Sequence, residues 1–108
     1  MRLKLSIIIL IGTALGLSGC SSTATTPGVD TIEIKDMKFI PDTITVDKGD
    51  TIIWVNKDMV AHNVTDETPN SWSSGVISSD GSWKWVASDS ANYYCSIHAV
   101  MKGVVKIK

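Results

Sequence analysis

Over residues 31–108 the sequence shows no helical periodicity of apolar residues longer than a turn or two, and no segment of it repeats. Helical and repeat architectures are therefore not expected. Basic residues are also few, because ten lysines and arginines stand against eleven acidic residues and form no basic patch. A chain with this charge pattern is not expected to bind nucleic acid.

The chain also lacks an apolar run long enough for a convincing membrane-spanning helix. The run from Leu5 to Leu17 follows Arg2 and Lys4 and leads into LSGC, which ends at Cys20. A basic start, a short apolar core and small residues predict a secretory signal peptide over 1–19, with an uncleaved anchor helix as the alternative. The ending resembles the lipobox of bacterial and archaeal lipoproteins, which implies lipidation of Cys20 and an extracytoplasmic protein anchored to the cell membrane.

The sequence has few cysteines, and lipidation of Cys20 would leave fewer free thiols still. If Cys20 carries a lipid, Cys95 is the only thiol of the mature chain, and a free thiol in an oxidising compartment is a liability unless it is buried or occupied. Loss of 1–19 would leave eight basic and eleven acidic residues, a net charge of −3. The small polar residues of 20–30 predict a lipidated N-terminus and flexible tether, and 31–108 is then the only folded domain.

Within 31–108, apolar and polar residues alternate between turn signals. Strands are predicted at 31–35, 43–46, 51–56, 62–65, 82–86, 91–97 and 103–108, with a hairpin turn at 79–81. About eight short strands in one small domain indicate an antiparallel β-sandwich or barrel. Trp72 is expected to be partly buried on an irregular connection, and the inward face of 51–56 stays open. The core candidates are Ile32, Ile34, Phe39, Ile44, Val46, Ile52, Trp54, Trp83, Trp85 and Val105.

The stretch YYCSIHAVMKG places Cys95, His98 and Met101 three residues apart. Thiolate, imidazole and thioether form a soft donor set suited to copper cycling between Cu(I) and Cu(II), and His62 supplies the second histidine that a blue-copper site requires. Taken singly, each residue has an ordinary interpretation: a satisfied or surface histidine, a buried cysteine, a core methionine. Zinc is a less apt occupant because thioether is a poor zinc ligand.

Two segments, FIPDTITVDKGDTIIWVNKDMVAHNV and YYCSIHAVMKGVVKIK, resemble the cupredoxins, specifically the plastocyanin and amicyanin branch. The resemblance extends over about 31–108, and the short gaps between Cys95, His98 and Met101 are closer to amicyanin. It implies a Greek-key β-sandwich holding one mononuclear type 1 copper and transferring single electrons. The implied ligands are His62, Cys95, His98 and Met101.

The resemblance also gives Asn63 a role, because it implies that Asn63 ties the His62 strand to the cysteine loop near Ser96. Two positions depart from the family, since Ala61 and Ala99 stand where proline is frequent. Proline fixes φ, so a ligand loop without it is expected to be more mobile.

Three classes of function compete. The favoured one is a monomeric, membrane-tethered carrier that passes electrons between protein redox partners. The alternative is a lipoprotein that stores or delivers copper. Delivery, however, would favour a labile site richer in methionine or histidine. An enzyme is not expected, because the chain has no His-x-His pair, no second loop cysteine and no G-x-S-x-G motif. Partner docking is predicted around His98, on uncharged residues: Met59, Val60, Ala61, Ala99 and Val100.

Overall fold

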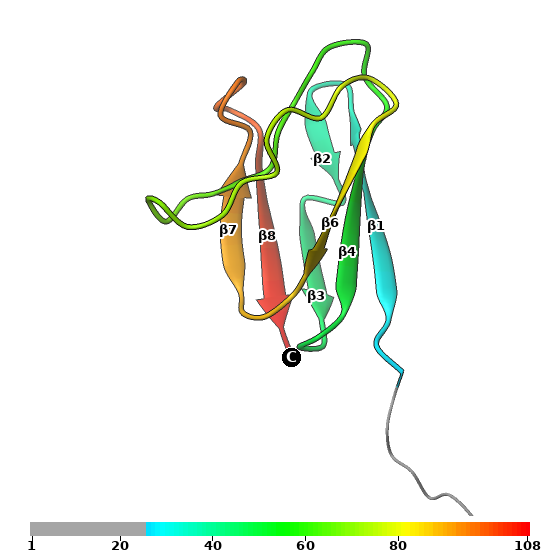
Figure 1. Ribbon diagram of the computed structural model, residues 1–108, viewed down its shortest axis with the longest axis vertical. Helices are drawn as coiled ribbons and strands as arrows, with labels where there is room; N and C mark the ends of the chain where they lie inside the picture. The colour runs from blue at the N-terminus through cyan, green and yellow to red at the C-terminus, as the bar shows by residue number, and fades with distance from the viewer. Residues whose placement is uncertain (1–25) are drawn as a thin grey trace, which may run out of the picture.

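The computed structural model describes residues 26–108, which form two four-stranded β-sheets (Figure 1). One sheet has the strand order β2-β1-β4-β6 and the other the order β3-β8-β7-β5. The predicted all-β sandwich of eight strands is confirmed. The strands are β1 (Val29–Lys35), β2 (Lys38–Ile40), β3 (Thr43–Val46), β4 (Thr51–Asn56), β5 (Thr65–Asp66), β6 (Ser82–Val86), β7 (Ala91–Tyr94) and β8 (Lys102–Ile107).

Two strand pairs are parallel, which corrects the expectation of a wholly antiparallel fold. β1 pairs with β4 in parallel, and β3 pairs with β8 in parallel. The reason is that the chain crosses between the sheets: it leaves the first sheet after β2, forms β3 in the second, and returns at β4 beside β1. Alternation within a strand reports which faces are buried and carries no information on the direction of its neighbour.

Several predicted boundaries differ from the observed ones. β1 begins at Val29, two residues earlier than predicted, so the sheet includes the end of the expected tether. The turn before β6 is present, but it does not form a hairpin, because β6 pairs with β4. The predicted strand 62–65 is wrong except at its end, where β5 begins at Thr65.

The predicted strand 91–97 is observed only as far as Tyr94, where β7 ends. The Cys95 amide donates to the Met101 carbonyl at 3.1 Å, and the Ser96 amide donates to Asn63 Oδ1 at 2.7 Å. The first bond follows the β7–β8 register, in which Tyr94 pairs with Lys102, whereas the second takes the Ser96 amide to another segment of the chain and ends the ladder. The bond between Cys95 and Met101 therefore closes the base of the loop after β7.

The core lies between the two sheets and follows the predicted set closely. Ile44, Trp83 and Trp85 are partly buried against it, and the other seven predicted residues are buried. In β4 the inward face consists of Ile52, Trp54 and Asn56. Trp72 is partly buried as predicted, with its ring centroid 5.6 Å from that of Trp83 and 4.7 Å from that of Trp85.

Tyr93 is a core residue that the sequence did not single out. It is fully buried, and its ring lies edge-on to Trp54 with centroids 5.3 Å apart. Its hydroxyl has no hydrogen-bond partner among the described residues. Burial raises the pKa of the Tyr93 phenol from 10.0 to about 12. The neutral phenol therefore stabilises the folded protein fully below pH 10, and that contribution is lost as the pH rises towards 12.

The buried phenol predicts an alkaline loss of stability that depends on Tyr93. Between pH 10 and 12 the wild type should lose on the order of 2–3 kcal/mol of unfolding free energy relative to Tyr93→Phe. Urea unfolding of both proteins in steps of pH measures the difference. Tyr94→Phe is the control, because it removes a neighbouring phenol and leaves Tyr93 in place. Parallel curves for the wild type and Tyr93→Phe would contradict the prediction.

Candidate metal centre

His62 lies on the chain between β4 and β5 and is held by its backbone. Its amide donates to the Ile77 carbonyl at 3.1 Å, and the Ile77 amide donates to the His62 carbonyl at 2.7 Å. This isolated bridge, not a regular strand, fixes the residue. The His62 side chain is fully buried. Its imidazole is therefore held in place by the surrounding protein.

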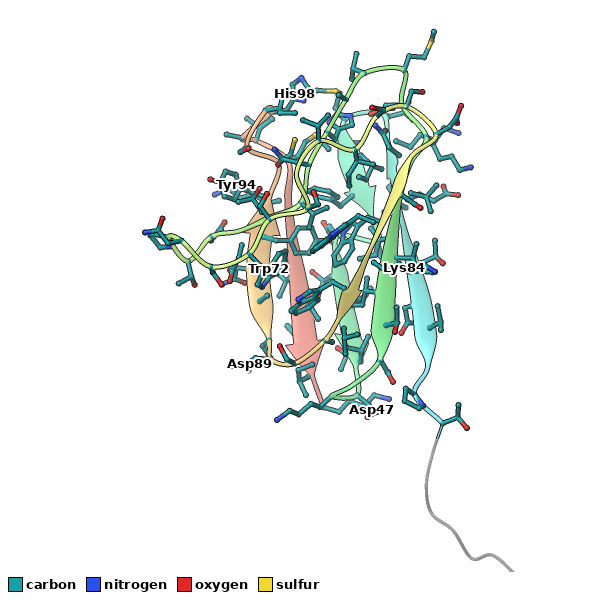
Figure 2. The ribbon with its side chains drawn as sticks, in the orientation of Figure 1. Asp47, Trp72, Lys84, Asp89, Tyr94 and His98 are labelled. Carbon is teal, nitrogen blue, oxygen red and sulfur yellow. The ribbon has the colours of Figure 1, made fainter. Side chains whose placement is uncertain are left out.

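Cys95, His98 and Met101 lie on the loop that joins β7 to β8. The Cys95 amide donates to the Met101 carbonyl and so joins the two ends of the motif. The Met101 amide donates to the His98 carbonyl at 3.0 Å and closes the turn between these two residues. Cys95 and Met101 are buried, whereas His98 is partly exposed. His98 lies at the upper end of the molecule, opposite Asp47 and Asp89 (Figure 2).

The structure brings three of the four predicted ligands to one point. Cys95 Sγ is 3.8 Å from His62 Nδ1 and 4.0 Å from His98 Nδ1. The two Nδ1 atoms are 3.2 Å apart, and the donor atoms of all three residues lie within 4.8 Å of one another. Met101, on the same loop, is only 3% exposed. Two imidazoles and a thiol that converge in this way can hold one metal ion.

Asn63 connects the two ligand-bearing segments. Its Nδ2 donates to Ser96 Oγ at 2.6 Å, and its Oδ1 accepts from the Ser96 amide at 2.7 Å. The Asn63 amide lies 3.4 Å from Cys95 Sγ and donates to it. A hydrogen bond from a backbone N–H stabilises the thiolate form of a cysteine, which is the form that binds metal.

Asp58 is a residue of the site that the sequence did not single out. Its Oδ2 lies 2.8 Å from His62 Nε2, and its side chain is 12% exposed. Burial opposes ionisation, yet hydrogen bonds from the Met37 amide, His62 and the Asp36 amide, with the charge of His62, lower the pKa of this carboxyl. The spacing of four residues between Asp58 and His62 was the available signal, but outside a helix that spacing does not predict contact.

The residues predicted to dock a partner are open to solvent beside the ligand loops. Met59 is 96% exposed, Val100 is 89% exposed and Val60 is 47% exposed. Ala99 is exposed and Ala61 is half-buried. Ile97, which was not among the predicted docking residues, adds another exposed apolar side chain to the cysteine loop.

The donor set fits copper. Two imidazole nitrogens and a cysteine sulfur, with the Met101 thioether on the same loop, are softer than the oxygen ligands that magnesium or calcium requires. They match the His₂Cys set with a weak methionine of a blue-copper centre. The fold and the site therefore define a mononuclear copper protein built on a β-sandwich. Residues 28–108 match the family model for copper binding proteins of the plastocyanin/azurin family, and the chain belongs to that family. It holds one type 1 copper.

Solved structures support the same fold. A methionine-to-alanine mutant of amicyanin in its Cu(I) form shares 21% identity at a TM-score of 0.71, with 79% of this chain and 87% of that chain covered. Amicyanin from Paracoccus versutus shares 22% sequence identity at a TM-score of 0.68, with 79% of this chain and 86% of that chain covered. A purple cupredoxin from Nitrosopumilus maritimus shares 21% sequence identity at a TM-score of 0.67, with 73% of this chain and 99% of that chain covered. No curated protein sequence matches the chain.

Proposed function

We propose that the protein is a type 1 copper protein that carries single electrons between protein redox partners while tethered to the extracytoplasmic side of a membrane. Its ligands are His62, Cys95, His98 and Met101. The observation that carries the proposal is the convergence of two histidines and a cysteine at a buried point from which only His98 reaches solvent. Copper bound there supplies a one-electron couple between Cu(I) and Cu(II).

The residues around the ligands favour electron transfer over exchange of the metal. His62 and Cys95 are fully buried and held by backbone hydrogen bonds, so the donor set is largely formed before the metal arrives. Release to a receiving protein would need access to these donors. Storage or delivery of copper is therefore the weaker candidate.

His98 is the proposed point of electron exchange. Its ring is partly exposed, and the uncharged residues Met59, Val60 and Val100 are exposed to solvent. An apolar patch loses its hydration easily and lets a partner approach closely, and redox complexes typically use small interfaces. These residues therefore suit brief encounters with donor and acceptor proteins. The protein is expected to act as a monomer.

Optical and EPR spectra of the purified protein after addition of Cu(II) test the proposal. An intense visible band from charge transfer between thiolate and copper, with narrow copper hyperfine splitting, is expected. Rapid exchange of electrons without loss of copper to a chelator would separate a carrier from a delivery protein. A colourless protein that prefers zinc would refute the copper proposal.

The membrane tether rests on residues outside those that the structure describes. The signal peptide over 1–19, Cys20 and the first part of the tether all precede residue 26. Within 26–108 no helix is long and apolar enough to cross a membrane. The proposed attachment is a lipid on Cys20, and the polar segment that follows it would hold the domain close to the membrane surface.

Cys20→Ala should prevent lipid attachment and leave the protein uncleaved or mis-sorted, with the visible spectrum of the folded domain unchanged. One acyl chain gives only weak, reversible membrane binding, so a modification with at least two chains is expected. Intact-mass measurement of membrane-extracted wild type and variant checks the prediction. A wild-type mass that corresponds to unmodified Cys20 would contradict it.

A further inference from the structure

The His62 ring has two nitrogens with different surroundings. Nδ1 faces Cys95 Sγ and His98 Nδ1, whereas Nε2 lies 2.8 Å from Asp58 Oδ2. A carboxylate accepts hydrogen bonds, so the Asp58 contact places the imidazole proton on Nε2. The lone pair of Nδ1 is then directed to the metal position.

Asp58 is itself held by several hydrogen bonds. Its Oδ1 accepts from the Asp36 amide at 2.7 Å and its Oδ2 from the Met37 amide at 3.1 Å. The Asp58 amide donates to Asn56 Oδ1 at 2.9 Å. Asn56 Nδ2 in turn donates to the Ile77 carbonyl at 2.9 Å. Since Ile77 also bonds the His62 backbone, the same network holds the ligand and the carboxylate.

The turn between β1 and β2 depends on the same carboxylate. Asp36 and Met37 have φ angles of 52° and 59°, in the left-handed region. A two-residue turn with this backbone ordinarily contains asparagine and glycine. Here neither position is glycine, and both amides point to Asp58. The carboxylate therefore compensates for an unfavourable turn sequence and joins that turn to the metal centre.

We propose that Asp58 is a positioning residue that holds His62 in the tautomer and orientation that bind copper through Nδ1. The proposal rests on the function proposed above. A carboxylate paired with a ligating imidazole raises the basicity of that imidazole and strengthens its bond to the metal. Its negative charge favours Cu(II) over Cu(I), so Asp58 is expected to lower the reduction potential and to tighten binding of Cu(II).

The competing explanation is that Asp58 only stabilises the β1–β2 turn. Asp58→Asn separates the two, because it removes the charge and one acceptor while keeping the size of the side chain. We expect Cu(II) affinity to fall by about 10- to 100-fold and the reduction potential to rise. Asp58→Glu should restore part of both. Asp89→Asn, which removes a carboxylate at the opposite end of the molecule, is the matched control and should change neither (Figure 2).

The tautomer is measured independently of copper. In ¹⁵N NMR of the apoprotein at alkaline pH, where imidazoles are neutral, wild-type His62 should carry its proton on Nε2. Asp58→Asn should shift it towards a mixture of tautomers. Wild-type His62 protonated on Nδ1 would overturn the proposal without any variant. The proposal would also be overturned if Asp58→Asn lowered the unfolding temperature but kept the wild-type His62 tautomer, Cu(II) affinity and reduction potential. Failure of the wild type to form a copper–thiolate band would count against the proposed function and leave the NMR result to decide the role of Asp58.

Discussion

Cys95→Ser should abolish the visible colour of the copper-loaded protein, because the charge-transfer band belongs to the bond between copper and thiolate. Cys95 is fully buried, and its Sγ is the atom shared by the contacts to both histidines. A serine hydroxyl is a harder donor and has no equivalent transition. We expect complete loss of absorbance in the visible region, measured on samples of equal copper content.

Met101→Leu is the comparison that assigns the other sulfur ligand. A weak axial thioether tunes the potential and contributes little to holding the metal, so Met101→Leu should keep copper and colour while moving the potential. Met59→Leu is the matched control, because Met59 is 96% exposed and lies outside the ligand loop. If Met101→Leu loses copper as completely as Cys95→Ser does, the role given to Met101 is wrong.

The cysteine loop was the most predictable part of the site, because its donors are close in sequence. Cys95, His98 and Met101 lie within seven residues, and any folding of that loop keeps them near one another. His62 was predicted by completing the donor set, not from local pattern. The way it is held could not be predicted, since its partner Ile77 lies on an irregular connection that has no strand signal.

Asp58 escaped sequence analysis for a different reason. Two of the three partners of its carboxylate, Asp36 and Met37, are 22 and 21 residues away in the chain and belong to another turn. A contact of this kind depends on how β1, β2 and β4 are arranged. The sequence indicated β1 and β4, but neither β2 nor the parallel pairing of β1 with β4. An aspartate that follows asparagine and lysine at the end of a strand looks like an ordinary solvated residue.

The core was predictable because burial follows from alternation and side-chain size. Ile32 and Ile34 alternate on β1, and Ile52 and Trp54 alternate on β4, as buried faces of a sandwich should. Tyr93 was missed because its ring is amphipathic and gives no clear preference for either side. Its complete burial comes from packing against Phe39 and Trp54, which are distant in sequence.

Val100→Glu should slow electron exchange with the native partner by about tenfold, and self-exchange by more, with colour and copper affinity almost unchanged. Val100 is 89% exposed and lies two residues from the partly exposed His98. A glutamate there interrupts the apolar patch and brings a charge to the contact. In self-exchange both copies carry the new charge, so repulsion adds to the cost of desolvation.

Stopped-flow rates of the wild type and Val100→Glu at several salt concentrations measure the effect. The part due to repulsion should recover as salt screens the charges, whereas the part due to a disrupted apolar contact should persist. Val86→Glu is the matched control: Val86 is 57% exposed at the end of β6, away from the ligand loops (Figure 1). It adds the same charge to the protein and should leave both rates near those of the wild type. Equal slowing by the two variants would assign the effect to net charge, and unchanged rates in Val100→Glu would move the docking surface away from His98.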